Sequence, residues 1–127
     1  MPSSLAGRNI LIVEDETMVA MLLEDIVEEM GCAIVGPTAR VANALSTLSS
    51  ATVDCAILDV NLNGESSYPI ADALAAKGVP YIFVSGYGVT GLDDAYQRHP
   101  VVQKPFTRAV LEQALESAML GSGTVSE

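Results

Sequence analysis

Polar residues that could carry chemistry follow four separate apolar runs of the chain. They are Glu14, Asp15 and Glu16 after residues 9–13, Asp59 after 54–58, Ser85 at the end of 80–85, and Lys104 after 100–103. Clustered carboxylates repel one another unless a cation lies among them, and hard oxygen ligands suit Mg²⁺. An aspartate beside such a cation can act as a nucleophile. A lysine and a serine hydroxyl could then bind phosphoryl oxygens, so these residue types predict phosphoryl transfer onto a carboxylate.

The elements that must position these residues alternate between strands and helices. Apolar runs of strand length are 9–13, 32–36, 54–58, 80–85 and 100–103. Segments with helical period or helix-start signals are about 17–30, 38–49, 69–77, 89–98 and 107–120. Five strands alternating with five helices predict an α/β domain with a parallel sheet. The strands lack polar–apolar alternation, which indicates that helices cover both faces of the sheet.

The predicted sheet brings the polar residues together. In an open parallel sheet, functional groups collect beyond the carboxyl ends of the strands. Each residue alone also has an ordinary explanation, since acids cap helices, serines occupy turns and lysines lie on surfaces. Their shared position at one edge favours a site over these separate explanations.

Composition limits the class of protein. The 127 residues suit a single domain, and their net charge of −10 argues against direct nucleic-acid binding. We expect no membrane span and no secretory signal, and hence a cytoplasmic protein. We also expect the protein to be a monomer or a weak dimer. Cys32 and Cys55 lie in apolar runs and are interpreted as buried thiols. Residues 121–127 are expected to form a disordered tail.

Two other site classes fit part of the pattern around Asp59. Residues 59–64, DVNLNG, match the start of an EF-hand calcium loop, but position 12 of that loop is Ile70 instead of glutamate. A phosphatase of the haloacid dehalogenase type would need a second acid where Asn61 stands. Both are therefore disfavoured.

Four motifs together resemble the receiver domain of two-component response regulators. They are ILIVEDE, AILDVNLNGE, FVSGYG and QKPF, in this order, within residues 7–120. The resemblance implies a doubly wound, flavodoxin-like three-layer sandwich with parallel strand order 2-1-3-4-5. It also implies a signalling protein, not an enzyme beyond slow autodephosphorylation. The donor would be a histidine kinase or phosphotransfer protein, and the output a contact with a downstream protein or competition for phosphate.

The resemblance also implies a role for each site residue. Asp59 corresponds to the phosphoacceptor, and Glu14, Asp15, Asp59 and the backbone carbonyl of Asn61 to the ligands of Mg²⁺ (or Mn²⁺). Ser85 corresponds to the switch hydroxyl and Lys104 to the lysine paired with it. Lys104 and Pro105 correspond to the family's cis peptide.

The chain departs from the family at the position three residues before the lysine. Val101 stands where an aromatic residue is usual, so the coupling of the hydroxyl to an aromatic ring needs another explanation. FVSGYG is loosely similar to a receiver subgroup with a Phe-Ala-Thr-Gly-x-Tyr stretch, and Tyr87 could take over the readout or pack as a turn residue. A degenerate receiver that binds partners without phosphorylation remains the alternative.

Overall fold

The computed structural model describes residues 5–86, 92–96 and 100–123. Five parallel strands form its main sheet in the order β2-β1-β3-β6-β7. Their bounds are β1 (Asn9–Val13), β2 (Ala33–Thr38), β3 (Cys55–Asp59), β6 (Tyr81–Ser85) and β7 (Val101–Gln103). Numbered among themselves, the five strands have the order 2-1-3-4-5, which confirms the sequence-based prediction.

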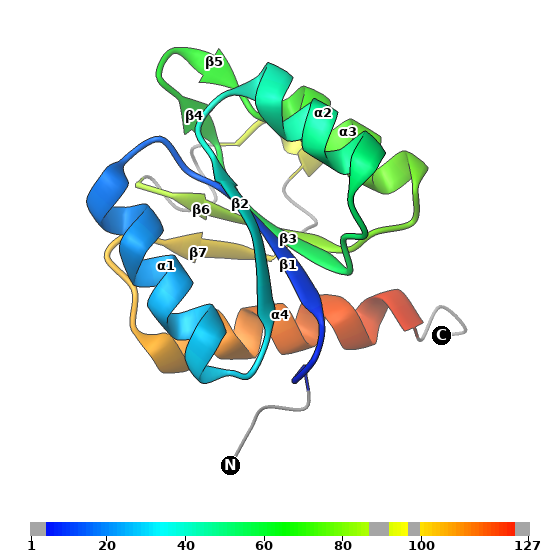
Figure 1. Ribbon diagram of the computed structural model, residues 1–127. Coiled ribbons are helices and arrows are strands. Elements are labelled where there is room, and N and C mark those ends of the chain that lie inside the picture. The colour runs from blue at the N-terminus through cyan, green and yellow to red at the C-terminus, as the bar shows by residue number, and fades with distance from the viewer. Residues whose placement is uncertain (1–4, 87–91, 97–99, 124–127) are drawn as a thin grey trace.

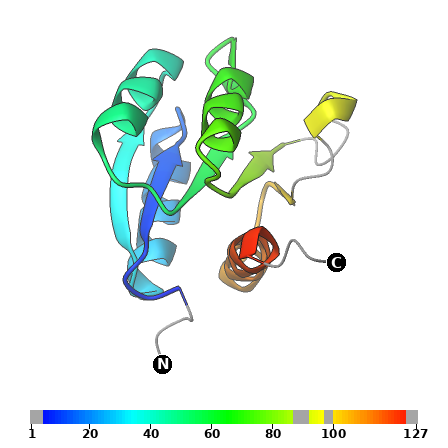
Figure 2. The same cartoon turned by 90° about the vertical axis from the view of Figure 1, so that its right-hand side faces the viewer.

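Helices cover both faces of the sheet and complete three layers (Figures 1 and 2). The helices α1 (Thr17–Glu29) and α4 (Arg108–Gly123) lie on one face, and α2 (Val41–Ser50) and α3 (Tyr68–Ala76) on the other. Successive residues of the central strand serve opposite cores: Ile57 packs on the α1/α4 side and Leu58 on the α2/α3 side. This two-sided burial explains why the strands show no polar–apolar alternation.

The structure corrects two of the expected helix positions. The expected helix over 89–98 is a 3-10 helix, Asp94–Tyr96, in the part of that segment that is described. Its Tyr96 N–H donates to the carbonyl of Asp93, three residues back, which gives the tighter turn. The last helix was expected to end at Gly121 but continues to Gly123, because glycine tolerates helical backbone angles as well as left-handed ones.

A bulge in β2 places the first acidic residue of the site. The register between β1 and β2 shifts between Leu11 and Val13, opposite Gly36. Gly36 has φ +95°, and a Cβ there would lie 3.1 Å from the carbonyl oxygen of Ile12, so a larger residue would be strained. Beyond the bulge, the Thr38 carbonyl accepts the Glu14 N–H at 2.9 Å. The bulge thus fixes the backbone of Glu14 where β1 ends.

No helix within the described ranges is long and apolar enough to cross a membrane.

Cys32 and Cys55 are both buried free thiols, as expected. Burial raises the pKa of both thiols, that of Cys55 to about 12, so neither is a reactive thiolate at neutral pH.

Candidate functional site

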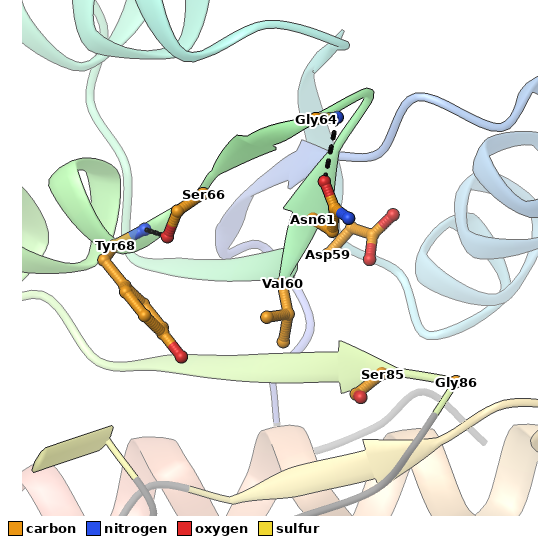
Figure 3. Close-up of a pocket in the computed structure, with 8 residues that line it drawn as sticks. All are labelled: Asp59, Val60, Asn61, Gly64, Ser66, Tyr68, Ser85 and Gly86. Carbon is orange, nitrogen blue, oxygen red and sulfur yellow. Dashed lines mark hydrogen bonds between the residues drawn. The ribbon is translucent and has the colours of Figure 1, made fainter. Parts of the chain in front are cut away.

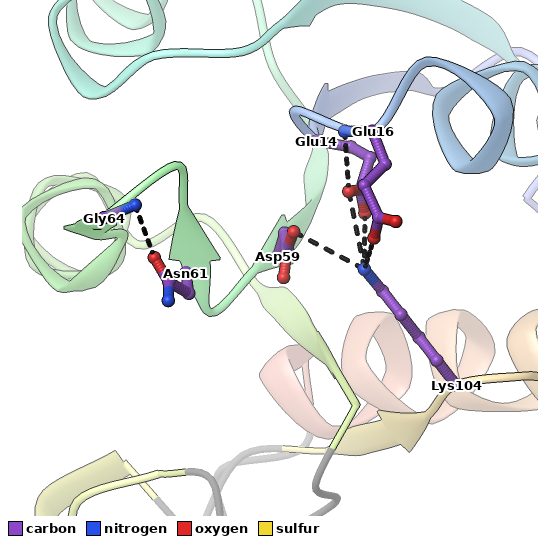
Figure 4. A network of polar contacts seen from close by, with 6 residues as sticks. All are labelled: Glu14, Glu16, Asp59, Asn61, Gly64 and Lys104. Atoms are coloured by element: carbon purple, nitrogen blue, oxygen red, sulfur yellow. Dashed lines mark hydrogen bonds and ion pairs between the residues drawn. The ribbon is translucent and has the colours of Figure 1, made fainter.

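The carboxyl ends of β1, β3 and β7 bring the predicted charged residues together (Figure 4). Glu14 follows β1, Asp59 ends β3 and Lys104 follows β7. Glu14 and Asp59 are buried, with 3% and 7% of their surfaces exposed, although acids are seldom buried without a partner. The sheet therefore holds two carboxylates in a position that needs compensating positive charge.

Three carboxylates are close enough to hold one cation. Oxygen atoms of Glu14, Asp15 and Asp59 all lie within 4.8 Å of one another. Glu14 Oε1 is buried and accepts no hydrogen bond from the residues the structure describes, although it lies 3.3 Å from Lys104 Nζ. Such an oxygen, beside two further carboxylates, fits a hard divalent cation such as Mg²⁺. The donor set thus agrees with the metal ligands predicted from the sequence.

Lys104 supplies the positive charge among these acids. Its Nζ lies 3.0 Å from Glu16 Oε1, 3.3 Å from Glu14 Oε1 and 3.5 Å from Asp59 Oδ2. The N–H of Glu16 donates to Glu14 Oε2 at 3.1 Å. The sequence shows Glu16 shortly after β1 but does not indicate a role for it. Its contact with Lys104 spans 88 residues, which sequence spacing alone does not reveal.

Crowding shifts the protonation equilibria of the site. Burial, a hydrogen bond with Glu14 and the negative charge of Glu14 raise the pKa of Asp59 to about 7, and the charge of Lys104 only partly opposes this. Burial alone would lower the pKa of Lys104, but the hydrogen bond with Glu16 and the charges of Asp59 and Glu14 leave it raised. Lys104 is therefore charged at neutral pH, while Asp59 needs more positive charge nearby to ionise fully.

Asn61 lies in a small hairpin next to Asp59. The strands β4 (Asn61–Leu62) and β5 (Glu65–Ser66) pair antiparallel around Asn63 and Gly64, whose φ angles are 53° and 92°. The Asn61 side-chain oxygen accepts the Gly64 N–H at 2.9 Å, so this amide is already used within the hairpin (Figure 4). That bond disfavours the side chain as a metal ligand and is compatible with the predicted role of the backbone carbonyl.

Sequence reasoning missed this hairpin, although a signal was present. Asn-Gly between two short β segments is the strongest local indication of a two-residue hairpin turn, because both residues tolerate positive φ. The sequence analysis considered residues 59–64 only as the start of a possible calcium-binding loop. The hairpin also buries Leu62, which anchors it on the α2/α3 core.

Ser85 ends β6 and is buried beside Asp59. Its side chain lines a pocket of about 370 Å³ together with Asp59, Val60 and Tyr68 (Figure 3). Tyr68 is the other residue that sequence reasoning missed, since the segment before Pro69 was interpreted only as a helix start. Tyr87 lies outside the described residues, and the peptide bond between Lys104 and Pro105 is cis.

Val101 takes its place in the sheet beside Phe83 of β6. It is partly buried against the α2/α3 core, as a short aliphatic side chain in a strand is expected to be. The structure therefore places no aromatic ring at this position.

Comparisons with known proteins agree with this geometry. Residues 10–116 match the family model of the response regulator receiver domain. The chain is similar to SdrG from Sphingomonas melonis Fr1, with 44% identity, a TM-score of 0.82, and coverage of 92% of this chain and 98% of that one. The BeF3-activated conformation of SdrG from Pseudomonas melonis Fr1 matches with 42% identity, a TM-score of 0.78, and coverage of 90% and 98%.

A curated relative is longer than this chain. An uncharacterized transcriptional regulatory protein, YbdJ of Bacillus subtilis (strain 168), is 36% identical over 83 residues. The match covers 64% of this chain but only 36% of that protein. The similarity is therefore to one part of YbdJ.

Proposed function

Because the chain belongs to the receiver-domain family of response regulators, we propose that Asp59 accepts a phosphoryl group with the help of Mg²⁺. One observation carries the proposal: Glu14, Asp15 and Asp59 place carboxylate oxygens within 4.8 Å of one another, with Lys104 Nζ 3.5 Å from Asp59. Receiver domains are partners of kinases or phosphotransfer proteins. The donor would be a phosphohistidine on such a protein, in the cytoplasm where ATP sustains it.

The residues of the chain divide the chemistry among them. An Asp59 carboxylate oxygen attacks phosphorus, the bond between phosphorus and the donor nitrogen breaks, and the imidazole leaves with a proton from solvent. Lys104 offsets the charge of the phosphoryl oxygens, and the Ser85 hydroxyl donates a hydrogen bond to one of them. Glu14, Asp15, Asp59 and the Asn61 carbonyl would hold Mg²⁺, which supplies charge neutralisation and orientation.

The signalling output follows from the same chemistry. A phosphoryl group carries up to two negative charges in place of the one on the Asp59 carboxylate, and it shifts the balance between conformations of the pocket. The product is an aspartyl phosphate that water removes slowly, so the protein acts as a switch or a phosphate sink and not as a turnover enzyme. Its output would be contact with a downstream protein.

The proposal is tested by incubating the full chain with acetyl phosphate and Mg²⁺. We expect a mass increase of one phosphoryl group in an adduct that survives acid and is lost in base, as an acyl phosphate is. Asp59→Asn should abolish the adduct. Asp54→Asn is the matched control, because Asp54 lies at the opposite end of β3 and accepts the Asn9 N–H.

The outcome separates the two candidate functions. An adduct that fails to form, or that persists in Asp59→Asn, contradicts phosphorylation of Asp59. A folded chain without an adduct would instead support the phosphorylation-independent binding module, which Val101 makes the second candidate.

A further inference from the structure

One wall of the Asp59 pocket is aromatic. Tyr68, the first residue of α3, lines the pocket together with Asp59, and Val60 lies between its ring and Ser85 (Figure 3). Its backbone N–H donates to Ser66 Oγ at 3.1 Å, which holds the start of α3 against the hairpin. The backbone of Tyr68 is therefore tied to the hairpin that follows Asp59.

The opposite face of Tyr68 is held by a distant part of the chain. Its ring stacks on Tyr96 with centroids 3.9 Å apart and planes 3° from parallel. The Tyr68 hydroxyl accepts the backbone N–H of Asp93 at 2.8 Å. Tyr96 in turn donates its hydroxyl to Asp72 Oδ1 of α3 at 2.9 Å. Residues 92–96 thus depend on Tyr68 for two of their contacts with α3.

Phe83 joins this pair to the strand that ends in Ser85. Its ring meets Tyr68 and Tyr96 edge-on, each with centroids 6.1 Å apart. We call Tyr68, Phe83 and Tyr96 the aromatic wall. Val101, the neighbour of Phe83 in β7, packs against the same core. Val101 thus shares a core with the aromatic wall, and Tyr68 of α3 brings a ring to the pocket.

We infer that Tyr68 couples the Asp59 pocket to residues 92–96, taking the place of an aromatic residue at position 101. The inference rests on the proposed phosphorylation of Asp59. A phosphoryl group with the Ser85 hydroxyl turned toward it changes the pocket that the Tyr68 ring borders. The ring can follow that change only if the Tyr96 stack and the Asp93 hydrogen bond change with it, so residues 92–96 report the state of Asp59.

Amide NMR of the full chain, with Mg²⁺ and saturating BeF₃⁻ as phosphoryl mimic, tests the coupling. Val60 reports on the site, because its N–H bonds to the Val84 carbonyl next to Asp59, and Asp93 reports on the aromatic wall. We expect both amide signals to shift in the wild type. In Tyr68→Leu we expect the Val60 shift to remain and the Asp93 shift to be lost.

Two variants keep the test decisive. Tyr81→Leu is the matched control, since Tyr81 also meets Phe83 edge-on, at 5.4 Å, but does not line the pocket, and it should keep the Asp93 response. Tyr68→Phe preserves the ring if Tyr68→Leu fails to fold. It should lose the response at the Asp93 amide while the Tyr96 ring protons still shift.

The failure of each claim is distinguishable. An absent Val60 shift in the wild type would contradict the proposed function. A Val60 shift without an Asp93 shift, or an Asp93 shift that survives in Tyr68→Leu, would overturn the coupling and leave phosphorylation of Asp59 standing.

Discussion

Two clusters of side chains meet at the Asp59 pocket, which Asp59 lines from one cluster and Tyr68 from the other, and they are stabilised by opposite kinds of interaction. The charged wall, formed by Glu14, Asp15, Asp59 and Lys104, brings like charges together, and Lys104 only partly offsets their repulsion. The aromatic wall consists of uncharged rings that stack and meet edge-on, and its two hydroxyls bond to the Asp93 N–H and to Asp72 Oδ1. Repulsion within the charged wall destabilises the fold at the site proposed for phosphorylation, whereas packing within the aromatic wall stabilises the fold.

This difference predicts how the stability of each wall should respond to pH and to bound cations. Charge repulsion depends on pH and on bound cations, because protonation or a metal removes it. Stacking between uncharged rings depends on neither at moderate pH. Variants in the charged wall should therefore change stability by amounts that vary with pH and Mg²⁺, and variants in the aromatic wall should not.

The largest effect is expected from Asp59→Asn in metal-free buffer. The pKa of Asp59 is about 7 in the folded chain against an ordinary value of 3.8, so between these pH values the folded state holds a proton that the unfolded state has lost. Stability is therefore lost as pH rises from about 4 to about 7. The variant lacks this loss, and its advantage over wild type should grow by on the order of 3 kcal/mol between pH 5 and pH 8.

Urea denaturation in EDTA at both pH values measures this advantage. Asp54→Asn is the matched control, because Asp54 lies at the other end of β3 and accepts the Asn9 N–H there. Millimolar Mg²⁺ at pH 8 should stabilise the wild type and narrow the gap. If the difference in unfolding free energy between Asp59→Asn and the wild type is equal at pH 5 and pH 8, then neighbouring carboxylates do not destabilise the charged form of Asp59.

A smaller effect is expected when the cation of the charged wall is removed. Lys104→Met leaves Glu14 and Asp59 without their partner, which should cost about 2 kcal/mol of unfolding free energy at pH 8 in EDTA. Mg²⁺ should recover much of that loss and bind the variant more tightly, because one positive charge has gone. The chain's other lysine, exposed Lys77, is the matched control.

Lys77→Met should change stability by less than about 0.5 kcal/mol with or without Mg²⁺. Equal losses in the two lysine variants, or a Lys104→Met loss that Mg²⁺ leaves untouched, would mean that Lys104 does not balance the acids. Isothermal titration with Mg²⁺ gives the affinity, and urea denaturation gives the stability.

The charged wall was predictable from sequence because each of its residues lies at the end of a strand or within two residues after it. In a parallel sheet with both faces covered, strand ends meet at one edge, so the apolar runs before Glu14, Asp59 and Lys104 already place these side chains together. The strand order was predicted correctly with the help of the family resemblance. Local glycine signals did less well, as Gly121 shows by lying inside α4.

The aromatic wall was not predictable in the same way. The contact between Tyr68 and Tyr96 joins the start of a helix to a 3-10 turn, and neither element has a periodicity that fixes where a ring will point. Its location depends on how the hairpin after Asp59 turns and where α3 begins. The Asn63-Gly64 turn could be predicted from the local sequence. The placement of Tyr68 against residues 92–96 is a consequence of tertiary packing and could not.

The smallest effect, and the sharpest contrast with the charged wall, is expected from Tyr96→Phe. The variant keeps the ring that stacks on Tyr68 and loses only the hydroxyl that donates to Asp72 Oδ1. Because this bond is exposed, its loss should cost about 0.5 kcal/mol. Urea denaturation should give the same cost at pH 5 and pH 8, with and without Mg²⁺. A cost that grew with pH or vanished in Mg²⁺ would show that the two walls are electrostatically linked, and the division of the pocket into independent halves would be wrong.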